Sequence, residues 1–156
     1  MCRSTVTAFN DDDGVALAIE RLLVRAGTAD SLGDERRRAS ALYEEYGFWC
    51  LESRPTSRFV GYCGIRPLVL EGTSEIEIGW HVGKTAWDRG IATEAATAAR
   101  ALAFGRFGLS QLVAIIHPDH VASQRVVEKI GMRHERTTII DDDYPATVYR
   151  AGRSAR

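Results

Sequence analysis

The sequence predicts a mixed α/β fold built on one sheet, in which an antiparallel meander is followed by a crossover helix and a parallel strand. Strand-like runs separated by short turns occupy residues 48–52, 59–70 and 75–82, a spacing that is typical of a meander. An alanine-rich helical run follows at 89–107, and an apolar, β-branched run follows at 111–117. A strand, a helix and a strand in this order favour a parallel pair with a right-handed crossover.

The other elements are expected on either side of this unit. Apolar residues at helical spacing predict a helix over 15–26, and a second helix is expected over 35–46. Toward the C-terminus the pattern predicts a short helix at 121–130 and two strands, at 132–140 and 146–150.

Composition limits the class of protein. A chain of 156 residues with 45% hydrophobic and 26% charged residues is expected to form one globular domain over 1–156. The net charge of −1 argues against a general nucleic-acid binder, which usually carries a basic excess. No apolar run is long enough to span a bilayer, and the first residues have no apolar core of signal-peptide length. We therefore expect a cytoplasmic protein without a nucleic-acid or membrane partner.

The cysteines point to structural rather than metal-binding roles. Cys2, Cys50 and Cys63 are odd in number and have neither C-x-x-C nor metal-site spacing. We expect reduced thiols and no metal, with Cys50 and Cys63 acting as small hydrophobic residues in strands.

Residues 87–95 read W-D-R-G-I-A-T-E-A and join the last meander strand to the long helix. The first N–H groups of a helix have no partner within it, and the helix dipole adds positive charge there, so such a turn can hold phosphate. Gly90 would let a ligand approach the backbone. Ala92 and Thr93 keep the next turn narrow, and Arg89 supplies a cation. We expect a diphosphate here, ordinary turn chemistry being the alternative; the absence of G-x-G-x-x-G excludes a dinucleotide-binding Rossmann turn.

Two blocks of the sequence together resemble a known enzyme family. The first is the 87–95 run, and the second is H-P-D-H-V-A-S-Q-R-V-V-E-K-I-G-M at 117–132. They resemble the GCN5-related N-acetyltransferases (GNAT), in particular the ribosomal-protein N-terminal acetyltransferase (RimJ/RimL-like) branch, and the likeness runs over 48–149. The matching residues are Trp87, Gly90, Ala92, Thr93, Glu94 and Ala95 in the first block, and Ser123, Glu128, Lys129, Gly131 and Met132 in the second.

The resemblance implies an acyl-CoA N-acyltransferase fold, in which the last meander strand splays from its parallel neighbour and helices cover both faces of the sheet. It implies an enzyme that uses acetyl-CoA as cosubstrate and acetylates a primary amine by direct attack in a ternary complex. The acceptor stays open between a protein N-terminal α-amine and a small-molecule amine, as does the choice between monomer and homodimer. The family's first-strand pattern is missing from 1–14, so the presence of that strand is open too. A non-catalytic CoA-binding or regulatory module with the same fold is the alternative function.

The resemblance also implies a path for the cofactor. The splayed strand pairs with the pantetheine arm through its backbone, and the turn after it holds the diphosphate. The residues expected on this path are Trp80, His81, Val82, Trp87, Arg89, Gly90, Ile91, Ala92, Thr93, His120 and Ser123.

Glu77 is the first candidate for removing the amine proton. Strand alternation puts it on one face with Gly79 and His81, two residues before the expected splay. A carboxylate there could attract an ammonium group or withdraw a proton through water; the alternative is a solvent-facing strand residue. His81 is the second candidate, because an ordinary histidine pKa of about 6.5 suits base chemistry, although a structural role is the alternative.

Three positions depart from the family pattern. His120 stands where the branch usually has asparagine, and Val127 stands where many members carry a tyrosine that protonates the leaving thiolate. Ser123 is therefore expected to hydrogen-bond or protonate the sulfur, the alternative being an ordinary surface serine. Asp88 would repel a diphosphate, so we expect it to turn away and cap the following helix.

Overall fold

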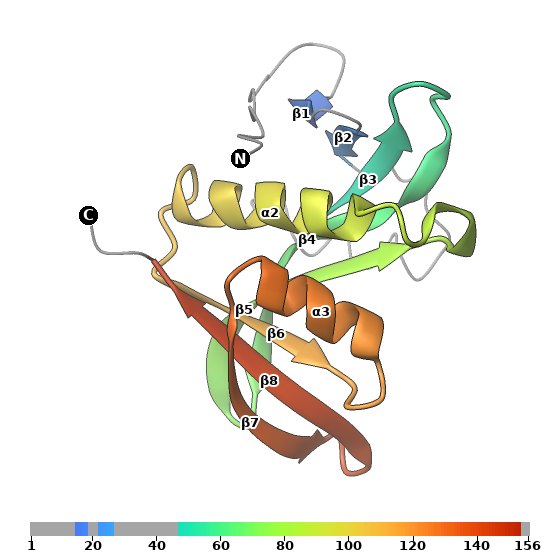
Figure 1. Ribbon diagram of the computed structural model, residues 1–156. Coiled ribbons are helices and arrows are strands. Elements are labelled where there is room, and N and C mark those ends of the chain that lie inside the picture. Colours follow the sequence, from blue (N-terminus) through green and yellow to red (C-terminus); the bar gives the residue numbers. More distant parts are fainter. Residues whose placement is uncertain (1–14, 19–21, 27–46, 154–156) are drawn as a thin grey trace.

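The computed structural model describes residues 15–18, 22–26 and 47–153 (Figure 1). It contains one eight-stranded sheet in the order β1-β2-β3-β4-β5-β6-β8-β7, and neighbouring strands are antiparallel except for β5 and β6. The predicted mixed sheet is thus confirmed. The elements are β1 Val15–Ala18, β2 Leu22–Ala26, β3 Gly47–Ser53, β4 Phe59–Leu70, β5 Thr73–Val82, the 3₁₀ helix η1 Lys84–Ala86, α2 Ile91–Phe104, β6 Gln111–Ile116, α3 Val121–Lys129, β7 Arg133–Ile140 and β8 Tyr144–Gly152.

The predicted helix over 15–26 is wrong, because residues 15–18 form strand β1 and residues 22–26 form strand β2. β2 pairs along its whole length with β3, from Leu22 opposite Ser53 to Ala26 opposite Trp49. The outer edge of β3 would otherwise present unpaired backbone groups, and this pairing overrides a weak local helix preference. The helix expected over 35–46 and the N-terminal stretch 1–14 lie outside the described residues.

A tight turn sets the register of the β4–β5 hairpin. Glu71 and Gly72 both have positive φ, at 48° and 83°, as a two-residue hairpin turn with the right twist requires. The turn places Arg66 opposite Glu77 and Tyr62 opposite His81. It therefore decides which side chains meet beside the expected site.

Both α-helices of the described part lie on the same face of the sheet (Figure 1). Along β6, Leu112, Ala114 and Ile116 face the helices, whereas Val113 packs in a second cluster on the opposite face. The second face carries no helix within the described residues, so the expectation of helices on both faces can be met only by residues outside them. Five of the seven buried residues of α2 are alanines, which lets the helix axis lie close to the sheet: Ala95, Ala96, Ala98, Ala99 and Ala103.

The predicted parallel pair of strands is present, but the two strands pair at a single position. Glu77 and Val113 are the single pair of Cα partners between β5 and β6, two strands that are described throughout. Beyond this pair, the part of β5 from 78 to 82 has no partner on β6. On its other side, β6 pairs in full with β8. The backbone edge of β5 thus stays available where the family resemblance places the pantetheine arm.

The two described cysteines are buried and free, Cys50 in β3 and Cys63 in β4. Burial raises the pKa of the Cys63 thiol to about 12. Such a thiol is inert at neutral pH, which confirms its expected role as a small hydrophobic residue.

Close packing of α2 on the sheet can be tested by overfilling the contact. Ala96 is fully buried, whereas its neighbour Thr97 is exposed. Ala96→Leu should lower the free energy of unfolding by about 1–3 kcal/mol, because the extra atoms have no room. Thr97→Leu, the matched control, should change it by less than about 0.5 kcal/mol. Urea unfolding measures both, and equal stability of Ala96→Leu and the parent would contradict the packing described.

Candidate active site

The turn before α2 has the geometry of an anion site. Gly90 is the N-cap in a left-handed conformation with φ 73°, and the Glu94 N–H donates to its carbonyl at 3.0 Å. The amides of Ile91, Ala92 and Thr93 precede this first helical hydrogen bond and have no acceptor within the helix. They point along the helix axis, where the helix dipole favours negative charge.

The expected cap by Asp88 is wrong, because Gly90 occupies the N-cap position and no side-chain cap hydrogen bond forms. Asp88 instead adopts φ 57°, a left-handed backbone conformation that aspartate tolerates better than most residues. Two left-handed residues, Asp88 and Gly90, therefore reverse the chain ahead of α2. The helix begins at Ile91, two residues later than the sequence pattern predicted.

Trp87 connects the turn to the end of β5. Its indole Nε1–H donates to the Val82 carbonyl at 2.7 Å, while 54% of the residue stays exposed. Trp80 and Val82 lie on the helix-covered face, where both pack in part against the core. The strand end and the phosphate-type turn are thus fixed relative to each other.

Glu77 is buried, with 8% of the residue exposed, so the alternative of a solvent-facing glutamate is wrong. Arg66, its partner across the hairpin, donates from Nε to Oε2 of the carboxylate. Burial nevertheless raises the pKa of Glu77 above its ordinary value, because loss of hydration outweighs the attraction of Arg66. A carboxyl group held in this way can accept a proton more readily than one in water.

His81 shares the face of Glu77, as strand alternation predicted, but not its surroundings. Its ring is exposed and stacks on Tyr62, with 5.3 Å between the ring centroids and 20° between the planes. Four residues along a strand correspond to about 13 Å, so the two side chains do not touch. The structure therefore keeps the two candidate bases apart.

The second family block forms the start of α3, on the helix-covered face. His120 is its exposed N-cap residue and makes no side-chain cap bond, and Ser123 is half-buried in the first turn. Val127 is fully buried in the core. This position therefore offers no hydroxyl group of the kind that a tyrosine would supply. Glu77 and His81 thus lie on one face of the sheet and His120 and Ser123 on the other, and the unpaired stretch of β5 separates them.

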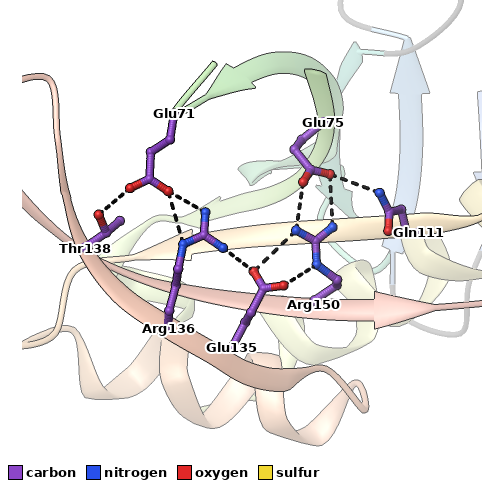
Figure 2. A network of polar contacts seen from close by, with 7 residues as sticks. All are labelled: Glu71, Glu75, Gln111, Glu135, Arg136, Thr138 and Arg150. Carbon is purple, nitrogen blue, oxygen red and sulfur yellow. Dashed lines mark hydrogen bonds and ion pairs between the residues drawn. The ribbon is translucent and has the colours of Figure 1, made fainter. Parts of the chain in front are cut away.

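Sequence reasoning missed the residues that hold β5 in place. Figure 2 shows a network that joins Glu71, Glu75, Gln111, Glu135, Arg136, Thr138 and Arg150. The side chain of Arg150 on β8 extends past β6 and donates hydrogen bonds to both carboxylate oxygens of the buried Glu75 on β5, at 2.7 and 3.0 Å. Hairpin symmetry about the Glu71–Gly72 turn could have paired Arg66 with Glu77. The Glu75–Arg150 pair spans 75 residues, and nothing in the local sequence marks it.

Ion pairing in the network shifts the pKa values of Glu71 and Arg150 in the directions that favour their charged forms. The Thr138 hydroxyl and Arg136 hold the pKa of Glu71 below its ordinary value. Glu75 and then Glu135 raise the pKa of Arg150. The charged forms are thus the favoured ones here, in contrast to Glu77.

Neither α-helix of the described part is long and apolar enough to cross a membrane. The described residues also contain no group of three or more His, Cys, Asp or Glu side chains placed to hold a metal ion.

Comparison with known proteins identifies the family. Residues 5–133 match the model of the "Acetyltransferase (GNAT) domain", which is well over half of the chain. The chain belongs to the GNAT acetyltransferase family. The splayed β5–β6 pair and the turn before α2 both lie within the residues that match this model.

Two relatives come from Bacillus subtilis (strain 168). The uncharacterized protein YkkB is 38% identical over 89 residues, which cover 57% of this chain and 52% of YkkB. The uncharacterized N-acetyltransferase YoaA is 32% identical over 98 residues, which cover 62% of this chain and 55% of YoaA. This GNAT chain spans about half the length of these relatives.

Solved structures show the same fold. A GNAT-family acetyltransferase from Bacillus anthracis has a TM-score of 0.67 at 23% identity, over 86% of this chain and 96% of that one. An acetyltransferase from Agrobacterium tumefaciens C58 has a TM-score of 0.67 at 24% identity, over 85% and 91%. RimL, a ribosomal L7/L12 α-N-protein acetyltransferase in complex with coenzyme A, has a TM-score of 0.68 at 13% identity, over 85% and 94%. At these identities the likeness establishes the fold alone.

The opposite pKa shifts of Glu77 and Glu71 predict opposite pH dependences of stability. A raised folded-state pKa stabilises the fold below the ordinary value, and this contribution is lost as pH rises through the raised pKa. The stability of the parent relative to Glu77→Gln should therefore fall as pH rises from acid to neutral. For Glu71, whose pKa is lowered, the contribution is lost as pH falls, so stability relative to Glu71→Gln should rise with pH. Urea unfolding across this pH range measures both, and equal slopes would contradict the assignment.

Proposed function

We propose that this GNAT protein transfers the acetyl group of acetyl-CoA to a primary amine, by direct attack within a ternary complex. The observation that carries the proposal is the end of β5. Here an unpaired stretch of strand backbone is tied through the Trp87–Val82 hydrogen bond to a helix start with three amides free of helical partners.

The residues fit acetyl-CoA at both ends of this path. The amides of Ile91 to Thr93, with the Arg89 cation, would hold the diphosphate, and the left-handed Gly90 keeps the approach clear of a side chain. The backbone of Trp80 to Val82 would pair with the pantetheine arm, beside Ser123 and His120 at the start of α3. When bound, acetyl-CoA supplies a thioester whose carbonyl carbon accepts the amine.

Glu77 is the residue best placed to handle the amine proton. Its carboxyl group lies on the face opposite α3, beside the point where β5 and β6 stop pairing. Its raised pKa suits a base that must accept a proton from an ammonium or amine, directly or through water. His81 on the same face is the second candidate. On the cofactor side, the Ser123 hydroxyl would hydrogen-bond the departing sulfur.

A non-catalytic CoA-binding module with the same fold is the second candidate function. The specific observation in its favour is that Val127 fills the core where many members carry a tyrosine, so α3 offers only the Ser123 hydroxyl at this level. Asp88 beside the turn would also repel a diphosphate. Thiol release from acetyl-CoA in the presence of a panel of amines distinguishes the two functions.

Cofactor binding at the turn can be tested with a strain-matched pair of glycine variants. Gly90→Val should abolish the thermal stabilisation by acetyl-CoA, because a branched side chain blocks the approach to the α2 amides. Gly108 has a similar left-handed φ of 63°, and the space around its Cβ position is open, so Gly108→Val matches the backbone strain without obstructing the turn. It should keep the stabilisation. Cofactor-induced shifts of equal size in both variants would place the diphosphate elsewhere.

The proposed proton transfer predicts a loss in rate with little loss in cofactor affinity. Glu77→Gln should lower kcat/KM by about 10²- to 10⁴-fold and remove the acidic limb of the pH profile. Ser123→Ala should cost less, because water can replace a hydroxyl. Glu128→Gln, an exposed position on α3, is the control for the same conversion and should keep the parental rate. Steady-state kinetics with any accepted amine measure these effects, and a parental rate and pH profile for Glu77→Gln would remove it from the mechanism.

A further inference from the structure

A pocket of about 790 Å³ lies on the face of the sheet that the described helices do not cover. It is bounded by the β4–β5 turn on one side and by the β7–β8 turn on the other, and contacts of Glu71 with Arg136 and Thr138 join these two sides (Figure 2). Glu77, the proposed base, is one of the lining residues. The volume is that of an ordinary small-molecule site.

About half of the pocket wall is apolar. Its aliphatic lining consists of Leu68, Val69, Leu70, Ile115, Ile139 and Ile140, and Tyr144 adds an aromatic ring. Three of these residues are exposed: Val69 is 70% exposed, Ile139 63% and Tyr144 42%. Large apolar side chains exposed together around a hollow indicate a binding surface, because covering them removes apolar area from water.

The charge of the pocket is negative. Arg66 offsets Glu77, and Arg136 offsets Glu71. That leaves Asp141 and Asp142, in the turn between β7 and β8, to which the described residues offer neither a hydrogen bond nor an ion pair. Two carboxylates without a charged partner among the described residues attract a cation and repel an anionic ligand.

We propose that this pocket binds the acceptor of acetyl transfer and selects primary amines carried on a compact apolar body, aromatic or branched aliphatic. The inference rests on the proposed function, since Glu77 is what links the pocket to acetyl transfer. The apolar walls take the body of the acceptor, the Asp141–Asp142 turn draws a cation toward the pocket, and Glu77 receives the ammonium group. The two aspartates are exposed and screened by water and salt, so they favour a cation without providing the desolvated contacts that a polycation needs. Among the polar side chains of the lining, Arg66, Glu71 and Glu77 are already engaged in ion pairs, which leaves fewer partners for a polyhydroxylated amine.

Binding of defined probes to the whole chain tests the pocket separately from catalysis. The probes are phenethylamine, its uncharged isostere phenethyl alcohol, spermidine and glucosamine, and their affinities are measured by calorimetry with and without CoA. Phenethylamine should bind tightest. Ile139→Ser should weaken it by about tenfold, because the variant removes aliphatic wall from an already exposed position. The Asp141→Asn, Asp142→Asn double variant should weaken it by about three- to tenfold at low salt and less at high salt. Asp143→Asn, in the same turn but outside the lining, is the matched control.

The outcomes separate this inference from the proposed function. Parental affinity in the Ile139→Ser variant, or tighter binding of spermidine or glucosamine than of phenethylamine, overturns the assignment. Absence of binding by all four probes overturns it as well. If phenethylamine binds as expected but releases no thiol from acetyl-CoA, the pocket stands and acetyl transfer fails. If amines are acetylated with kinetics that these variants leave unchanged, acetyl transfer stands and the pocket assignment fails.

Discussion

The structure depends on how weakly β5 and β6 are joined. A single pair of Cα partners, Glu77 and Val113, connects the two halves of the sheet through the backbone. Arg150 strengthens this junction from β8 by reaching past β6 to the buried carboxylate of Glu75. Replacing only one partner of such a shielded ion pair is costly, because the other charge is then left without a partner away from water. Because Glu75 precedes Glu77 in β5, this ion pair holds the strands together on one side of the junction and leaves the other side unpaired.

In the proposed function, the unpaired side lets the two faces of the sheet bind different substrates. The helix-covered face provides the α2 amides and the first turn of α3 with Ser123, which together suit an anionic cofactor. The opposite face provides Glu77 and the negatively charged pocket, which suit a cationic acceptor. A continuous β5–β6 ladder would keep the two substrates apart. The end of pairing at Glu77 is therefore the feature that makes a ternary complex sterically reasonable.

The surroundings of Glu77 show how one strand position can carry both structure and chemistry. Burial favours the neutral carboxylic acid, and the Arg66 guanidinium across the hairpin favours the carboxylate. Because burial prevails, the group keeps an affinity for protons that an exposed glutamate lacks. Only a few residues away, the Thr138 hydroxyl and Arg136 hold the pKa of Glu71 below its ordinary value. One hairpin thus contains carboxylates in opposite electrostatic regimes, and the difference comes from what each one faces.

The sequence by itself determined the local elements and the family. Period-two alternation, the glycine at the helix start and the alanine stripe are local features, so β3 to β8, the two helices and the faces of Glu77 and His81 could be predicted. Pairing that crosses the chain could not. Residues 22–26 form a strand because they pair with the edge of β3. Gly90, and not Asp88, is the N-cap of α2. Arg150 binds Glu75, which lies 75 residues away in the sequence. Burial of Glu77 and the pocket beside it also needed the folded sheet, because burial and partners depend on segments far apart in the chain.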